Sequence, residues 1–400
     1  MHSTSSELPL LTIEGQQYMP VEWNSTHTDY PRDKCMHELF EQHVREAPGA
    51  IAVVCGPRKL TYAELNCKAN QLANYLRKLG VCPDVLVGIC MYRCLEMIIG
   101  ILGILKAGAA YVPLDPAYPQ KRLASMVEDV DLYLILTTTD TRAILPENNI
   151  AQICLDSDWP RIAGESGDNL PATASVENLC YVIFTSGSTG KAKAAAVFHR
   201  GWTNLMHWFV TEFKVNPADK VLVISSFSFD ITQRSIVMPL ISGAQLHLLA
   251  SNYYDPTLII QTIADQEITR MNCAPSTFYP LVENSKDAFR KVRSLQTLFL
   301  GGEAISASRI REWAECEECG AEVANVYGAA ECSDVSTFYI LKDYARYIQN
   351  SVPIGKPIFN TQIYLLDESL NSVAPGQPGE ICIAQPMRMG NDSLLIFLTL

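Results

Sequence analysis

Apolar residues at a helical spacing mark the clearest element near the start of the chain. The segment opens on the capping-box sequence Thr61-Tyr62-Ala63-Glu64, and Gly80 follows it as a helix stop. Between these two signals, apolar side chains recur three or four residues apart at Leu65, Ala69, Leu72, Leu76 and Leu79. The pattern predicts a helix that begins at the capping box, ends near Gly80 and buries one face.

Short apolar runs alternate with further helical patterns along most of the chain. Strands are expected at residues 51–54, 85–91, 111–114 and 132–136, and helices at residues 33–44, through Lys106 and at 121–127. A second alternation runs from residue 181 to about 338. Residues 146–179 are polar and rich in Asp, Ser and Pro, and are expected to cross the surface. This alternation indicates an α/β protein with parallel sheets that helices cover.

Changes in composition along the sequence predict the boundaries of several structural units. Residues 1–30 are polar and interrupted by prolines, as in a linker. Two α/β halves follow at about 31–180 and 181–345. A small β-rich unit is expected at about 346–384, where turn residues separate short apolar runs. Residues 385–400 form a tail with a strongly apolar end.

The overall composition narrows the class of protein. The chain has 400 residues, 48% apolar and 18% charged, as in globular proteins. Its net charge of −12, with no basic block, argues against nucleic acid or an anionic membrane as partner. The longest apolar run is about nine residues, against roughly 20 for a membrane span. No secretory signal is visible, and thirteen scattered cysteines suggest reduced thiols. We therefore expect a cytoplasmic protein.

A loop rich in glycine, hydroxyl and lysine side chains follows the expected strand Tyr181-Val182-Ile183-Phe184. It reads Thr185-Ser186-Gly187-Ser188-Thr189-Gly190-Lys191-Ala192-Lys193. Glycines let consecutive N–H groups face one anion, while hydroxyls and lysines add donors and charge, so the loop suits a phosphate. It is not a Walker P-loop, because the glycine spacing is too short and no Ser or Thr follows Lys191. The alternative is a flexible loop between two strands.

With its surroundings, this loop resembles that of the amino-acid-activating adenylation domains of nonribosomal peptide synthetases, in the adenylate-forming, AMP-binding superfamily. Matching motifs occur in order at residues 60–65, 105–116, 185–193, 229–230, 301–303, 325–328 with Glu331, and 354–357. The resemblance implies two αβα-layered subdomains and a small β-barrel-like third unit, together the N-terminal adenylation core at residues 31–384. In that family a small mobile C-terminal subdomain follows.

The implied reaction joins an amino-acid carboxylate to the α-phosphate of ATP, with Mg²⁺, and later transfers the aminoacyl group to a carrier-protein thiol. By resemblance the catalytic residues are Thr185, Lys191 and Glu331, and Glu331 binds Mg²⁺. The ATP-binding residues implied are Thr185, Ser186, Gly187, Ser188, Thr189, Gly190, Lys191, Lys193, Gly301, Gly302, Glu303, Asn325, Tyr327, Gly328 and Ala330. Without the neighbouring motifs, we would favour Tyr327-Gly328 as an ordinary strand end and Glu331 as a solvated carboxylate.

A free amino acid also needs a partner for its ammonium, and by resemblance that partner is Asp230. Taken alone, Asp230 suits a helix N-cap. The implied amino-acid pocket consists of Asp230, Ile231, Arg234, Asn272, Phe299, Gly301, Val326, Asp334 and Val335. Arg234 and Asp334 pair with each other, or one of them meets a polar or charged substrate side chain. Of these substrates we favour a polar one.

Other candidate groups are weaker. His199 lies in a further family motif but is equally a capping or packing residue, and we expect His207 and His247 to be structural. Cys316 and Cys319 form a lone pair without a second pair or nearby histidines, which disfavours a zinc or redox role. The family implies a carrier protein with a phosphopantetheine arm, and either a synthetase partner or an MbtH-like protein.

Several residues differ from the family pattern, and these differences lower the catalytic activity that we expect. Ala192 and Ala194 stand where the loop usually has Pro and Gly, and Ala329-Ala330 replaces Pro-Thr. The resemblance ends after Ala384, and the motifs of the C-terminal subdomain are absent from the sequence. We therefore expect a truncated enzyme with impaired turnover, whose residues 385–400 reflect a shifted reading frame or early stop. Residues 394–400 would then lack a partner and favour aggregation.

Two other functions remain open at this point. The first is a non-catalytic adenylation-domain remnant, or binding module, that associates with a synthetase. The second is an aryl or acyl acid ligase of the same superfamily, for which Asp230 would have no ammonium to bind.

Overall fold

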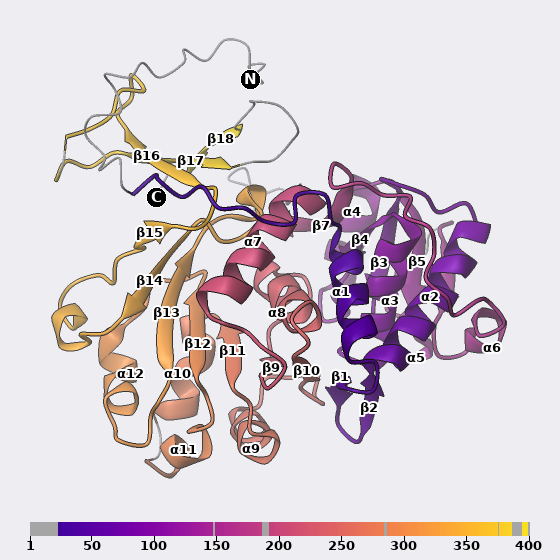
Figure 1. The fold of residues 1–400 in the computed structure, drawn as a ribbon, viewed down its shortest axis with the longest axis horizontal. Coiled ribbons are helices and arrows are strands. Elements are labelled where there is room, and N and C mark those ends of the chain that lie inside the picture. Colours follow the sequence, from indigo (N-terminus) through magenta and orange to yellow (C-terminus); the bar gives the residue numbers. More distant parts are fainter. Residues whose placement is uncertain are drawn as a thin grey trace.

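Two large sheets and one small sheet organise the chain (Figure 1). The computed structural model describes residues 23–146, 149–185, 192–283, 286–374, 376–385 and 394–398. The first large sheet has six strands, all parallel except the last, which is antiparallel. In spatial order they are β6 Ala151–Cys154, β5 Leu132–Thr137, β3 Leu86–Cys90, β4 Ala110–Pro113, β7 Leu179–Thr185 and β8 Lys193–Phe198.

The second large sheet has nine strands with a parallel centre and antiparallel edges. In spatial order they are β15 Lys356–Pro357, β14 Thr337–Leu341, β13 Glu322–Tyr327, β12 Thr297–Gly301, β11 Arg270–Cys273, β9 Lys220–Val223, β10 Gln245–Leu248, β1 Ile51–Cys55 and β2 Arg58–Thr61. The predicted α/β class with parallel sheets is confirmed.

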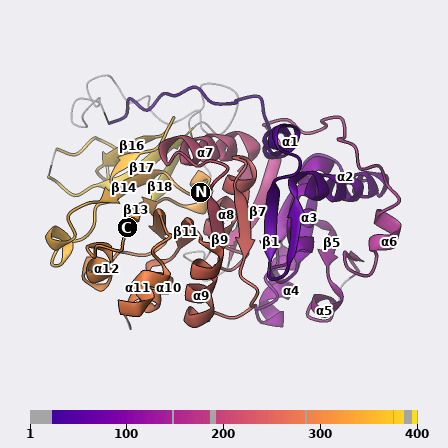
Figure 2. The same ribbon diagram turned by 60° about the horizontal axis from the view of Figure 1, so that its bottom comes forward.

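Helices fill the space between the two sheets and cover their outer faces. The inner helices are α1 Met36–Glu46, α2 Tyr62–Lys78, α3 Leu95–Ala107, α7 His199–Glu212 and α8 Asp230–Leu240. On the outer face of the nine-stranded sheet lie α9 Pro256–Gln266, α10 Pro275–Val282, α11 Lys286–Lys291 and α12 Ala307–Ala314 (Figure 2). Helix α4 Gln120–Asp129 packs on the outer face of the six-stranded sheet, and α5 Thr139–Arg142 and α6 Trp159–Ile162 are short.

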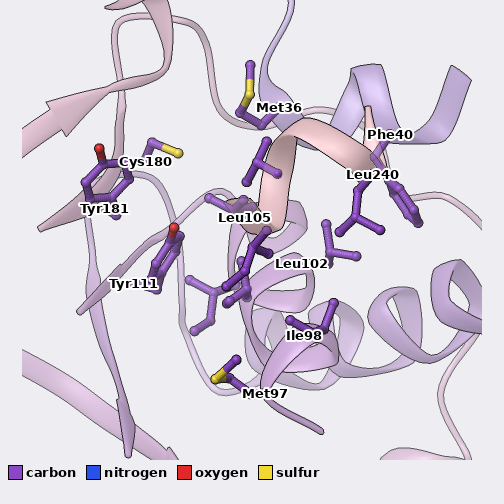
Figure 3. Close-up of a cluster of buried hydrophobic side chains, with 14 of the residues drawn as sticks. Met36, Phe40, Met97, Ile98, Leu102, Leu105, Tyr111, Cys180, Tyr181 and Leu240 are labelled. Carbon is purple, nitrogen blue, oxygen red and sulfur yellow. The ribbon is translucent and has the colours of Figure 1, made fainter. Parts of the chain in front are cut away.

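The largest hydrophobic core surrounds α3, whose residues are all buried except Glu96. Figure 3 shows Ile98 and Leu102 of α3 beside Phe40 of α1 and Leu240 of α8. Helices from both halves of the chain therefore share one core, which fixes the two sheets relative to each other. Among the described residues, no helix has the length and apolar character required to span a bilayer.

The capping box predicted at Thr61 is present. The Glu64 N–H donates to Thr61 Oγ1 at 3.2 Å, and the Thr61 N–H donates to Glu64 Oε2 at 2.8 Å. Helix α2 ends at Lys78, and Gly80 has φ +96°, a left-handed conformation that suits glycine.

The two sheets do not divide at residue 180, where the sequence suggests a boundary between halves. Strands β1 and β2 join the nine-stranded sheet through β10, and β7 and β8 extend the six-stranded sheet to Phe198. The expectation for residues 146–179 was incomplete, because β6 pairs in parallel with β5. Strand β6 has only four residues, too few to show a periodic pattern within the polar segment around it.

The third unit is a three-stranded antiparallel sheet rather than a barrel within the described residues. It contains β16 Gln362–Leu366, β17 Glu380–Gln385 and β18 Leu394–Leu398. Strand β18 pairs with β17 along its length, from Gln385↔Leu394 to Ile381↔Leu398. The expectation that the end of the chain lacks a partner was therefore wrong, since the backbone of these residues completes the small sheet.

Candidate active site

The predicted phosphate loop joins β7 to β8, with Thr185 paired to Lys193 across its base. Lys193 is exposed. The loop residues Ser186, Gly187, Ser188, Thr189, Gly190 and Lys191 lie outside the described residues. The strand predicted before the loop is confirmed as β7.

The end of β7 touches a second predicted site residue. Thr185 Oγ1 donates to Glu331 Oε1 at 3.1 Å, and the same hydroxyl lies 3.4 Å from the Lys193 carbonyl. Glu331 is exposed in the 3₁₀-helix η2 Ala330–Cys332, where the Ala330 side chain is buried. A hydroxyl and a carboxylate oxygen therefore lie together where the two large sheets meet.

The segment Gly301-Gly302-Glu303, expected to bind ATP, begins at the last residue of β12. Gly301 is buried, and a Cβ there would lie 2.7 Å from the Val326 carbonyl oxygen, so only glycine fits beside β13. Gly302 has φ +81°. The Glu303 carboxylate accepts hydrogen bonds from the Ser276 N–H at 3.1 Å and its hydroxyl at 2.9 Å, which ties the segment to α10.

The end of β13 carries the other predicted ATP-binding residues. Tyr327 is half-buried and Gly328 is exposed. A Cβ on Gly328 would overlap the Asp334 carbonyl oxygen, so glycine permits a close backbone approach. Asn325 donates through Nδ2 to the Pro353 carbonyl at 2.8 Å. The Asn325 amide nitrogen therefore already has a structural partner.

Asp230 is the first residue of α8, and Phe229 occupies the N-cap position. Asp230 Oδ1 accepts from the Ile231 N–H at 2.7 Å, and the side chain is half-buried. The N-cap alternative is thus off by one residue, although a carboxylate in the first turn still suits the helix dipole. Asp230 and Arg234 lie four residues apart, so they share one face of α8.

Arg234 and Asp334 form a buried ion pair. Arg234 Nε also donates to Asn272 Oδ1 at 3.2 Å, so three predicted pocket residues from separate elements meet. Burial raises the pKa of Asp334 to about 7, against the lowering effect of Arg234, and the negative charge of Asp230 raises it further. The pairing alternative is confirmed for these two residues.

Strand register explains why the remaining pocket residues gather. Asn272 pairs with Phe299, and Gly301 pairs with Val326, so these positions share one face of the nine-stranded sheet. The Phe299 ring packs at 4.6 Å from that of Phe213, deep in the core. Val335 is buried in the same core.

Tyr181 is a buried polar residue that the sequence did not single out. It lies in β7 opposite Tyr111, its hydroxyl has no hydrogen-bond partner in the described residues, and its pKa is raised by burial first and then by Asp334. The pKa effect of Asp230 on Tyr181 has the same direction. In the sequence Tyr181 belongs to an apolar strand run, which offers no signal beyond packing.

The structure also shows the surroundings of the weaker candidate groups. His199 begins α7, is fully buried and accepts from the Met36 N–H at 3.4 Å, which supports its packing role. All thirteen cysteines are free, including Cys316 and Cys319. Within the described ranges, no three His, Cys, Asp or Glu side chains gather in a metal-binding group.

Comparison with known protein families gives a match over most of the chain. The family model described as AMP-binding enzyme matches residues 40–390. The chain therefore belongs to the AMP-binding enzyme family, and the match continues past Ala384, where the sequence resemblance was expected to end.

The chain is similar to parts of much longer proteins. It is 41% identical to one of the linear gramicidin synthase subunits of Brevibacillus parabrevis over 378 residues, which cover 94% of this chain and 7% of that protein. It is 37% identical to tyrocidine synthase 3 of the same organism, and the aligned residues cover 96% of this chain and 6% of that protein. The chain thus spans less than a tenth of the length of either relative.

Solved structures share the fold. The nonribosomal peptide synthetase FmoA3 aligns with a TM-score of 0.84 and 29% identity, covering 93% of this chain and 39% of that one. FmoA3 has also been solved with AMPPNP and with α-methyl-L-serine-AMP. The N-terminal subdomain of Klebsiella oxytoca NpsA, in complex with 3-hydroxybenzoyl-AMSN, aligns with a TM-score of 0.81 and 21% identity. The alignment covers 93% of this chain and 96% of that one.

Proposed function

We propose that the chain activates an amino acid as its aminoacyl adenylate in nonribosomal peptide synthesis. The amino-acid carboxylate oxygen bonds to the α-phosphorus of ATP, and the bond from that phosphorus to pyrophosphate breaks. The observation that supports this proposal is the hydrogen bond between Thr185, the first residue of the expected phosphate loop, and Glu331, the glutamate that the family pattern implies for Mg²⁺.

The residues present fit ATP and Mg²⁺. Magnesium prefers oxygen ligands and is commonly held by one or two carboxylates together with substrate phosphates. Glu331 offers an exposed carboxylate, and Lys193 offers a cation at the base of the loop. A bound Mg²⁺ would neutralise charge on the phosphates. Thr185 would orient the Glu331 carboxylate, and Asp230 would pair with the substrate ammonium.

Amino-acid-dependent exchange of labelled pyrophosphate into ATP tests this function across a panel of amino acids. Exchange is expected with a narrow set of amino acids and is expected to fall in Glu331→Gln. Calorimetry with a non-hydrolysable aminoacyl-adenylate analogue reports binding separately. The absence of both exchange and analogue binding across the whole panel would refute the proposal.

A carrier protein is the proposed recipient of the aminoacyl group. The support is one structural match, an artificially fused adenylation–PCP di-domain from Klebsiella oxytoca with a TM-score of 0.82. An MbtH-like protein remains a second partner to test by adding it to the exchange assay.

A non-catalytic binding module is the alternative that one observation favours. Ala330 is buried without a hydroxyl, where the family pattern has threonine, so this position donates no side-chain hydrogen bond. Analogue binding without any pyrophosphate exchange would support the binding module over the enzyme.

A further inference from the structure

Three buried side chains in the amino-acid pocket each keep one polar atom unpaired among the described residues. The atoms are Arg234 Nη2, Asn272 Nδ2 and Asp334 Oδ2, on side chains that are at most 5% exposed. A buried polar atom without a partner costs about 1–3 kcal/mol, and nearly all such atoms in native proteins are paired. Three of them on one bonded cluster indicate a place that a ligand completes.

The position of the cluster indicates which part of a ligand it meets. Asp230 lies at the half-buried start of α8, and Arg234 lies one helical turn further along the same face. Arg234 Nη2 lies 3.7 Å from the point where a Cβ on Gly301 would stand, so glycine leaves room beside this nitrogen. If Asp230 holds the substrate ammonium, the cluster faces the end of the substrate side chain.

The unpaired atoms define a pattern of donors and acceptors. Arg234 Nη2 donates. Asn272 Nδ2 also donates, because the oxygen of the same amide already accepts from Arg234 Nε. Asp334 Oδ2 supplies an acceptor. A primary carboxamide meets all three atoms, since its oxygen accepts two hydrogen bonds and its NH₂ group donates one.

We propose that the substrate is an amino acid whose side chain ends in a primary carboxamide, asparagine or glutamine. This inference rests on the proposed function and deepens it. The charges of Arg234 and Asp334 balance, so a carboxylate or ammonium side chain would bury a charge without a counter-ion. An aliphatic side chain would leave all three atoms unpaired, and a hydroxyl, with a single oxygen, reaches fewer of them.

Affinity measurements on the full chain test the inference. The probes are the sulfamoyladenosine analogues of the aminoacyl adenylates of all twenty standard amino acids, titrated by calorimetry. The asparagine or glutamine analogue is expected to bind best, with the leucine analogue weaker by about 10⁴-fold. If no analogue binds and no amino acid drives exchange, the proposed function fails. If an analogue of another class binds best, the function stands and this inference is overturned.

Asp334→Asn provides a sharper test, because it removes the negative charge and keeps the shape. Arg234 then becomes a buried cation without a counter-ion, so preference is expected to move at least about tenfold from the carboxamide to the matching carboxylate substrate. A preference unchanged from the parent chain would overturn the inference. Asp219→Asn is the matched control, since Asp219 pairs with buried Arg270 at the other end of β11 and is expected to leave preference unchanged.

A milder variant keeps the test open if Asp334→Asn fails to fold. Asn272→Leu has a similar volume and removes the proposed Nδ2 donor together with the Oδ1 atom that accepts from Arg234 Nε. The affinity for the carboxamide analogue is expected to fall about tenfold relative to the leucine analogue. Equal changes for both analogues would show that Asn272 does not read the substrate side chain, and would overturn the inference.

Discussion

The Thr185 hydroxyl donates a 3.1 Å hydrogen bond to the carboxylate of Glu331, across 146 residues of sequence. Thr185 ends a strand of the six-stranded sheet, and Glu331 follows β13 of the nine-stranded sheet. The bond joins the two sheets where parallel strands of both reach their carboxyl ends, which is the usual ligand-binding edge of α/β folds.

Replacing Thr185 with valine is expected to slow pyrophosphate exchange about 10- to 100-fold. A hydrogen bond to a charged group contributes about 1.5–3 kcal/mol, and that free energy corresponds to one to two decades in rate if it acts in the transition state. Thr262→Val is the control, because Thr262 bonds to the Leu258 carbonyl on α9, away from the site. Equal losses in the two variants would argue against a role for the Thr185 contact.

Gly328→Ala is expected to abolish binding of an adenylate analogue. The added Cβ would overlap the Asp334 carbonyl oxygen, so the segment that carries Glu331 and Asp334 would have to move. Gly320→Ala is the matched control, since a Cβ on Gly320 meets nothing within 4 Å. Calorimetry with the analogue and a urea titration of each variant separate lost binding from lost folding. Unchanged affinity in Gly328→Ala would show that this close approach does not shape the site.

Local signals predicted much of this fold, whereas pairings between distant segments could not be predicted. The Thr61 cap and the helix that follows it depend on neighbouring residues, so the sequence alone indicated them. The pairing of β1 with β10 depends on segments nearly 200 residues apart. The positions of Asp230, Arg234 and Asp334 followed from family motifs, but the unpaired atoms of their cluster depend on side-chain geometry.

Acid is expected to destabilise the protein partly through His199. Burial lowers the pKa of His199 to about 4, opposed by the negative charge of Asp84, while 6.5 is its ordinary value. As the pH falls below about 6.5, His199 binds a proton in the unfolded chain but stays neutral in the folded chain until about pH 4. The stability of the folded state that is present above about pH 6.5 is therefore lost as the pH falls. Between about pH 7.5 and about pH 5, the free energy of unfolding is expected to fall by about 2 kcal/mol because of this one histidine.

His199→Phe tests this effect, because it keeps a ring against His37 and removes the proton site. The free energy of unfolding, measured in urea at both pH values, is expected to change by about 2 kcal/mol less in the variant than in the parent chain. The same pH dependence in both proteins would mean that other groups cause the acid sensitivity.

Removing residues 386–400 is expected to lower solubility. The sequence suggested that residues 394–400 lack a partner and favour aggregation. In the structure, however, Leu394–Leu398 covers one edge of β17, and the buried side chains of Ile381 and Ile383 lie in that strand. An uncovered strand edge can pair with another molecule. Light scattering and the soluble fraction after expression measure the effect. A shorter chain that is more soluble than the parent, with an unchanged unfolding midpoint, would show that β18 contributes nothing to the small sheet.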